Sequence, residues 1–166
     1  HDDLHFLPGG KEFLWASERD GNYHIYRYRL DGTLVNQVTR GPWSLASSGG
    51  VFWVRQAVTG VDLGWMYFTA MEKSPVGRHL YRMRLDGTGM QRLSIEDGVH
   101  RISMSPDARF YTDALSDART LPVLKLGRTD RSDAAVMARA RFDLLESVAI
   151  QYPEMTTIHT RDGFAM

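Results

Sequence analysis

The chain has 166 residues, of which 43% are hydrophobic, and its 20 basic side chains balance 20 acidic ones. Since neither sign is concentrated in one segment, the sequence gives no electrostatic footprint for nucleic acid or for an anionic membrane surface. Cysteine is absent, which excludes disulfides and thiolate metal sites from this chain but assigns no compartment.

The first elements in chain order are two copies of one hairpin. The sequence HIYRYRLDGT at residues 24–33 returns as HLYRMRLDGT at residues 79–88. In each copy apolar and polar residues alternate, which is typical of a β-strand, and each copy ends at Asp-Gly, a favoured hairpin turn. An aromatic strand precedes each copy, at residues 13–18 and 65–70, and a shorter strand follows, at residues 34–39 and 90–94. A duplicated unit of antiparallel strands is therefore predicted.

A third, more divergent copy follows. Residues 109–113 take the place of the aromatic strand, and residues 122–126 take the place of the next one. Ahead of them the Ser-Pro-Asp sequence at residues 105–107 predicts a turn, because Ser and Asp side chains bond nearby backbone N–H groups and Pro fixes φ.

These repeats indicate an all-β fold, a partial β-propeller. Units of four short antiparallel strands, spaced at close to the ~40 to 50 residues of propeller blades, are the signature of that architecture. The chain supplies two to three and a half four-stranded blades, too few to close a ring of ~4 to 8. An immunoglobulin-like sandwich is the alternative, but it does not account for two nearly identical hairpins.

The last part of the chain changes character. Residues 134–151 contain good helix formers, with Phe142, Leu145 and Ala149 at helical spacing, and Pro153 follows as a helix breaker. We therefore expect propeller blades over residues 1–133, a short helical linker over 134–152, and the start of a further domain over 153–166.

No catalytic, cofactor-binding or metal-binding residue is predicted. The chain contains no G-x-S-x-G nucleophile elbow. Ser103, Ser105, His100 and Asp107 suggest a triad, but they crowd one strand and its turn, and no third element holds the imidazole. The six histidines show no ligand spacing.

Two histidines and several aromatic residues of the repeats are expected to stabilise the fold rather than to bind a ligand. His24 and His79 occupy the same slot of the repeat, so each should bond within its own blade. Recurring aromatic residues should pack between blades; they are Trp15, Tyr26, Trp43, Tyr67 and Tyr81. Gly87 and Gly89 lie in a turn without the strand-to-helix context of a phosphate-binding loop.

The chain resembles the propeller domain of dipeptidyl-peptidase IV-like serine peptidases, in the prolyl oligopeptidase superfamily. The resemblance is carried by the repeats quoted above and by three further segments: HDDLHFL at the start, YFTAMEKSPVGRHLYRMRLDG and SMSPDARFYTDALSDARTLPV. The C-terminal PEMTTIHTRDG resembles the strand by which that family enters its α/β-hydrolase domain. The resemblance implies that this chain is the C-terminal part of the propeller, with the hydrolase domain outside it.

In that family the propeller and the hydrolase domain enclose a cavity in which a Ser–Asp–His triad cuts peptides after the second residue. A pair of propeller glutamates holds the substrate amino terminus. Neither Glu18 nor Glu72 stands beside another glutamate, so neither takes that role. Asp2 and Asp3 are the substrate-side candidates, from their place before the first blade.

The resemblance implies a peptide substrate shared with the missing hydrolase domain, no cofactor, and a periplasmic or otherwise extracytoplasmic protein whose full-length form can be a homodimer. Nucleic acid and membrane contacts are not expected. The alternative is a non-catalytic propeller that serves as a binding scaffold, since such propellers also carry Ser-Pro-Asp turns. A G-x-S-x-G motif downstream of Met166 would select the peptidase.

Overall fold

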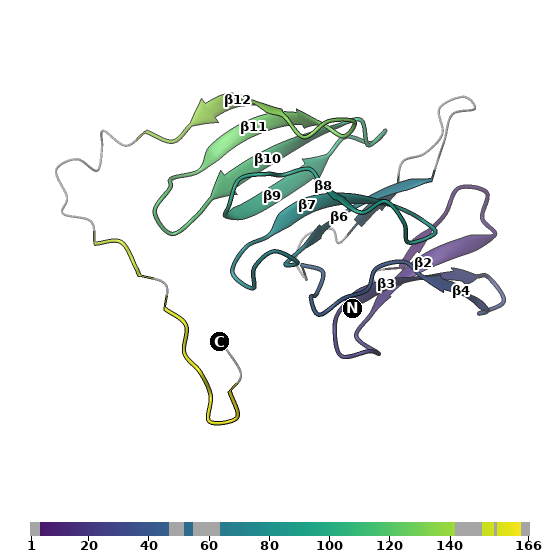
Figure 1. Ribbon diagram of the computed structural model, residues 1–166. Coiled ribbons are helices and arrows are strands. Elements are labelled where there is room, and N and C mark those ends of the chain that lie inside the picture. The colour runs from purple at the N-terminus through teal and green to yellow at the C-terminus, as the bar shows by residue number, and fades with distance from the viewer. Residues whose placement is uncertain (1–3, 47–51, 55–63, 142–150, 155, 164–166) are drawn as a thin grey trace.

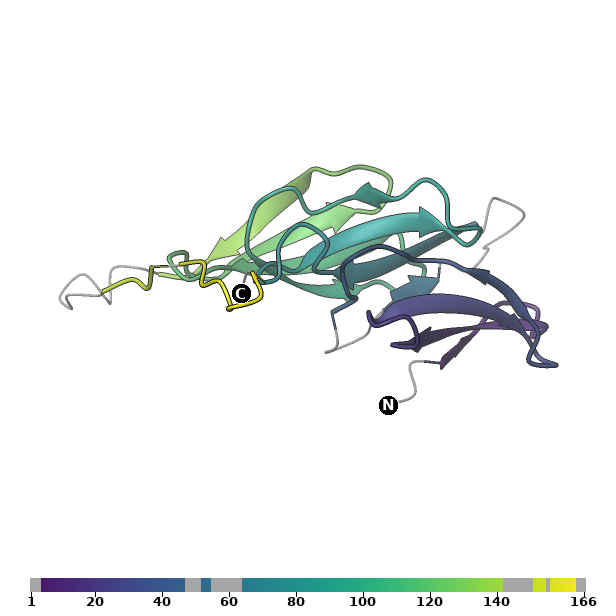
Figure 2. The ribbon, with the colours of Figure 1, turned by 60° about the horizontal axis from the view of Figure 1, so that its bottom comes forward.

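The computed structural model describes residues 4–46, 52–54, 64–141, 151–154 and 156–163. Within these residues the named strands form three four-stranded antiparallel sheets, which follow one another in chain order (Figure 1). Turning the molecule shows the first sheet in purple, the second in teal and the third in green as successive blades (Figure 2). The all-β, partial-propeller prediction is confirmed.

The first two sheets are built on the duplicated hairpins. The first sheet contains β1 (Leu4–Phe6), β2 (Glu12–Ser17), β3 (His24–Arg29) and β4 (Leu34–Gln37). The second contains β5 (Phe52–Val54), β6 (Trp65–Ala70), β7 (His79–Arg84) and β8 (Gln91–Arg92). Gly32 and Gly87 adopt φ of 85° and 88° at equivalent turns, a conformation that favours glycine. The Asp carboxylate of each turn accepts a backbone N–H bond, at 2.9 and 2.8 Å.

The third sheet contains β9 (Val99–Met104), β10 (Phe110–Ser116), β11 (Val123–Arg128) and β12 (Ala134–Arg139). β12 corrects the sequence prediction, because the helix expected over residues 134–151 is wrong for its first six residues. They pair antiparallel with β11, with Ala134 opposite Gly127 and Ala135 opposite Leu126. As a strand, β12 forms hydrogen bonds with the backbone N–H and C=O groups on the edge of β11, which a helix would leave unpaired. The free energy of these bonds outweighs the helix propensity of alanine. The third blade thus extends to Arg139, beyond the predicted boundary at 133, and residues 142–150 lie outside the described ranges.

The core lies between neighbouring sheets, because strand alternation sends side chains to opposite faces. Leu14 and Ala16 of the first sheet contact Met66 and Phe68 of the second in one buried cluster. Tyr67, which follows Met66, points to the other face and joins a second cluster with the third sheet. That cluster contains Tyr67, Leu80, Leu93, Ala108 and Tyr111. Each fully buried large side chain contributes about 1.5–3 kcal/mol to this packing.

The aromatic residues divide between two environments. Trp43 stacks on Phe68 between the first two sheets, with ring centroids 6.3 Å apart, and Tyr67 and Tyr81 are buried between sheets. Packing between blades is therefore confirmed for these three residues. Trp15 and Tyr26 instead lie on the opposite face of the first sheet, where the Arg19 guanidinium sits 5.4 and 4.3 Å from their ring centroids.

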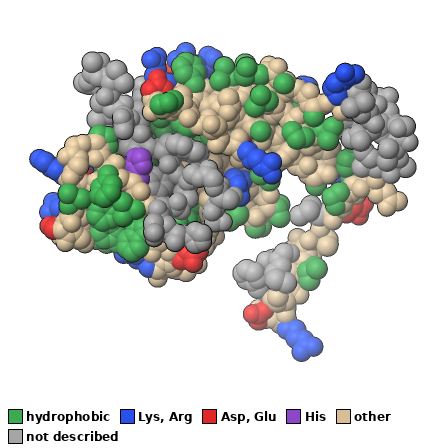
Figure 3. All heavy atoms as spheres, turned by 180° about the vertical axis from the view of Figure 1, so that it is seen from behind, with side chains coloured by type: hydrophobic (Ala, Val, Ile, Leu, Met, Phe, Trp, Pro, Cys, Tyr) green, Lys and Arg blue, Asp and Glu red, His purple; other side chains and the backbone are tan. Residues whose placement is uncertain are grey.

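That opposite face of the first sheet is apolar and open. Leu4 and Trp15 are cross-strand neighbours on it, as are Phe6 and Phe13. Phe6 is 60% exposed and Leu4 is 43% exposed. The view from behind shows hydrophobic side chains gathered over the first sheet, at the left (Figure 3).

Candidate functional site

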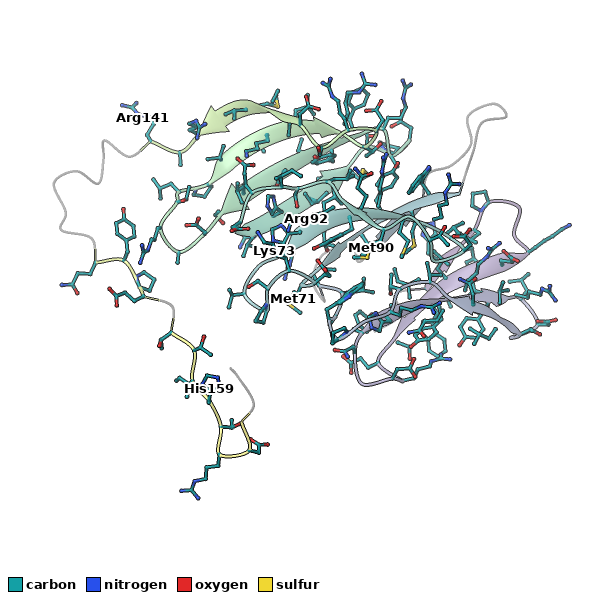
Figure 4. All side chains as sticks on the ribbon, in the orientation of Figure 1. Met71, Lys73, Met90, Arg92, Arg141 and His159 are labelled. Atoms are coloured by element: carbon teal, nitrogen blue, oxygen red, sulfur yellow. The ribbon has the colours of Figure 1, made fainter. Side chains whose placement is uncertain are left out.

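A cleft of about 860 Å³ lies where loops of the second and third sheets meet. Its walls come from the β6–β7 loop, the segment before and at the start of β9, and the β10–β11 loop, and Pro153 of the C-terminal segment completes it. The polar and charged side chains among its lining include Lys73, His79, Asp97, Arg101, Asp117 and Arg119. Figure 4 shows Lys73 in the β6–β7 loop.

Asp117 fixes the shape of the β10–β11 loop. One of its carboxylate oxygens accepts hydrogen bonds from the backbone N–H groups of Arg119 at 2.7 Å and Thr120 at 2.6 Å. These bonds, the one from Arg119 first, lower the pKa of Asp117. A side chain that mimics a backbone turn in this way gives a short loop a defined conformation. The arginine that follows is thereby positioned at the cleft.

The charge of the cleft is unevenly compensated. Lys73 forms an ion pair with Asp97, which ties the β6–β7 loop to the turn before β9, and the hydrogen bond from Lys73 lowers the pKa of Asp97. Asp117 interacts electrostatically with Arg119 on the same loop, an interaction that also lowers the pKa of Asp117. The lining therefore holds the basic side chains of Lys73, Arg101 and Arg119 against the acidic side chains of Asp97 and Asp117.

The two repeat histidines lie deep in equivalent positions of their sheets. His24 Nδ1 is 3.2 Å from Thr39 Oγ1, and His79 Nδ1 is 3.4 Å from Ser94 Oγ. Each hydroxyl also accepts a backbone N–H from the strand beside it, at 2.9 and 2.8 Å. The histidines thus bond within their own blades. Burial, and then the neighbouring His100, lower the pKa of His79.

His100 is held by two acceptors. Its Nδ1 lies 2.6 Å from Asp113 Oδ2 and its Nε2 lies 2.9 Å from the Glu96 carbonyl oxygen. Both ring nitrogens therefore lie within hydrogen-bonding distance of a buried oxygen, which fixes the orientation of the ring. The side chains of the pair are 0% and 3% exposed. With both nitrogens engaged, His100 has none available to act as a base.

The structure separates the residues that suggested a triad. His100 pairs with Asp113 rather than Asp107. Ser105 Oγ donates to Asp107 at 2.7 Å and accepts from two backbone N–H groups at 3.0 and 3.2 Å, which closes the Ser-Pro-Asp turn. Ser103 lies on the opposite face of β9 from His100, since odd spacing along a strand reverses the face. His100, Ser105 and Asp107 therefore make structural hydrogen bonds.

Sequence reasoning missed Asp113 and the two cleft arginines. One signal was present for Asp113, because a charged residue at an inward position of the alternating strand β10 needs a buried partner. The cleft carried no such signal, since its walls come from loops far apart in the chain. The candidates Asp2 and Asp3 lie outside the described residues.

No helix in the described part of the chain is long and apolar enough to cross a membrane. No group of three or more His, Asp or Glu side chains there converges as a metal site would.

Comparison with known proteins extends the resemblance. Residues 1–122 match the family model of the dipeptidyl peptidase IV (DPP IV) N-terminal region. A probable dipeptidyl-aminopeptidase B of Emericella nidulans is 37% identical over 103 residues, and one of Aspergillus oryzae is 33% identical over 96 residues. These alignments cover 59% and 55% of this chain and 10% of each relative. The chain thus spans about a tenth of the length of the curated relatives it matches.

The crystal structure of Porphyromonas gingivalis dipeptidyl peptidase 4 matches 98% of this chain and 22% of its own, with a TM-score of 0.79 and 25% sequence identity. Three blades are therefore shared along with the sequence pattern. Since the family model covers well over half of the residues, this chain belongs to the dipeptidyl peptidase IV N-terminal region family.

Proposed function

We propose that this chain is part of the propeller wall of a serine-type dipeptidyl aminopeptidase. In this role it shapes and gates the access of short peptides to an α/β-hydrolase domain that lies outside these 166 residues. The observation that carries the proposal is the match of 98% of the chain to one dipeptidyl peptidase structure. Residues 153–166 are, in this proposal, the entry into the hydrolase domain.

The use of the polar side chains supports a wall rather than a catalytic role. His24, His79 and His100 are all buried and bonded within the blades. Ser105 is committed to a turn. Amide hydrolysis needs an activated nucleophile, a base and an oxyanion hole held together, and these side chains are held apart for other bonds.

Hydrolysis of Gly-Pro-p-nitroanilide tests the proposal. The full-length protein should cleave it, and the 166-residue chain alone should not at any pH. A full-length protein that folds but is inert would favour the scaffold propeller instead. Hydrolysis by the isolated chain, lost in Ser103→Ala or Ser105→Ala, would place catalysis in these blades and contradict the proposal. Sedimentation of the full-length protein tests the further expectation of a homodimer.

A further inference from the structure

The open apolar face of the first sheet (Figure 3) corresponds to a covered face of the second. Trp15 lies opposite Tyr26 in the first sheet, and Phe68 lies opposite Tyr81 at the same place in the second. Phe68 and Tyr81 belong to the face by which the second sheet packs on the first, and Phe68 is 0% exposed. Trp15, at the corresponding position, is 39% exposed. The open face thus uses the positions that form an interface between blades.

The partner surface in that interface consists of small and aliphatic side chains. Phe68 and Tyr81 pack in one buried cluster with three residues of the first sheet: Leu14, Ala16 and Ile25. Leu14 and Ala16 come from β2, and Ile25 comes from β3, which pairs with it. Aromatic rings bury a large apolar area against such a surface. A partner for the open face is therefore expected to present aliphatic residues from two paired strands.

We propose that a further blade of the same polypeptide, outside these 166 residues, packs on the open face of the first sheet as the first sheet packs on the second. This blade carries small or aliphatic side chains at the positions of Leu14, Ala16 and Ile25, and it buries Trp15. The solved relative extends well beyond the 22% of its own length that is matched, which supports a polypeptide with room for further blades. The inference rests on the larger propeller of the proposed function and not on peptidase activity.

Hydroxyl-radical footprinting of the full-length protein tests the proposal without a substitution. The oxidation rate of each side chain in the native protein is divided by its rate in the urea-unfolded protein. Val35 is the matched control, because it is 40% exposed and its counterpart Met90 stays 36% exposed in a sheet packed on both faces. The ratio for Trp15 should fall below about one tenth, as for a core residue, while that for Val35 stays several times higher. Equal ratios for Trp15 and Val35 would overturn the proposal.

Dilution identifies the source of the covering blade. A blade of the same polypeptide protects Trp15 equally at every protein concentration, whereas a second copy of the protein dissociates on dilution. Loss of protection on dilution would therefore overturn the assignment to the same polypeptide. A protein that protects Trp15 but does not hydrolyse Gly-Pro-p-nitroanilide would support this inference and contradict only the peptidase proposal.

A pair of matched substitutions provides a second measurement in the full-length protein. Trp15→Glu places a carboxylate in the proposed interface, where it has no compensating partner, and should lower the urea midpoint by about 1 M or more. Val35→Glu adds the same charge at a position that stays exposed and should leave the midpoint unchanged. Equal midpoints for the two variants would overturn the proposal.

Discussion

The buried pair of His100 and Asp113 joins the neighbouring strands β9 and β10 and should stabilise the third sheet, and Asp113→Ala measures this contribution. Truncating one member of a buried ion pair leaves the other without compensation and costs about 3–5 kcal/mol. Asp113 Oδ1 has no hydrogen-bond partner among the described residues, so part of the carboxylate's desolvation is already unrecovered. We therefore expect the lower end of that range, about 3 kcal/mol.

Urea unfolding followed by circular dichroism provides the assay. With a denaturant slope of about 1–3 kcal/mol per molar urea, the midpoint of Asp113→Ala should fall by about 1–3 M. The double variant His100→Leu/Asp113→Leu removes both polar side chains and should lie within about 1 kcal/mol of the parent, because an apolar pair carries no desolvation penalty. Asp130→Ala, which breaks an exposed pair with Arg128, should leave the midpoint unchanged.

A loss below about 1 kcal/mol for Asp113→Ala would refute the reasoning, since that is the cost of an ordinary substitution. A double variant as unstable as the single one would also refute it. In that case side-chain packing would determine the stability at this position, and the polar pair would contribute little.

Three further predictions concern the same blades. Gly127→Ala should lower the free energy of unfolding by about 1–3 kcal/mol, because its Cβ would lie 2.2 Å from Tyr111 Cζ; the urea midpoint checks this. Ala108→Gly should change the thermal midpoint little. Glycine relieves the strain of the positive φ of 50° at this residue, which stabilises the fold by about 1–2 kcal/mol. Loss of the buried methyl group costs about 0.8 kcal/mol, and the greater entropy of glycine in the unfolded chain costs about 0.4–1 kcal/mol, so the contributions nearly cancel. The pKa of His79 is lower in the folded protein than its ordinary value of 6.5. Below about pH 6.5 the unfolded state therefore binds more protons at this residue than the folded state does, so stability falls as the pH drops. His79→Gln should flatten that slope in urea titrations at several pH values.

The sequence was sufficient to predict the strands of the two duplicated hairpins and their turns. Asp31-Gly32 and Asp86-Gly87 are local signals, because the turn conformation and its Asx bond involve only adjacent residues. Alternation around Leu14 and Ala16 likewise predicts an inward face without knowledge of its partner. These features depend on short-range physics, and the structure confirms them.

The remaining features depend on partners distant in the chain. β12 forms because β11 offers it an edge, which the helix-favouring alanines at 134 and 135 do not reveal. His100 finds Asp113 because β9 and β10 are paired in one register. The cleft exists only after loops carrying Lys73, Arg101 and Arg119 are brought together. Composition and spacing cannot encode such proximity without the sheet topology.

Mapping the reactive serine tests the central claim most directly. The full-length protein is treated with a fluorophosphonate and digested, and the labelled serine is located by mass spectrometry. Our account predicts one labelled serine outside these 166 residues, within a G-x-S-x-G motif. A label on Ser103 or Ser105 would contradict the assignment of these blades to a non-catalytic wall, and a folded protein without any label would contradict the peptidase proposal.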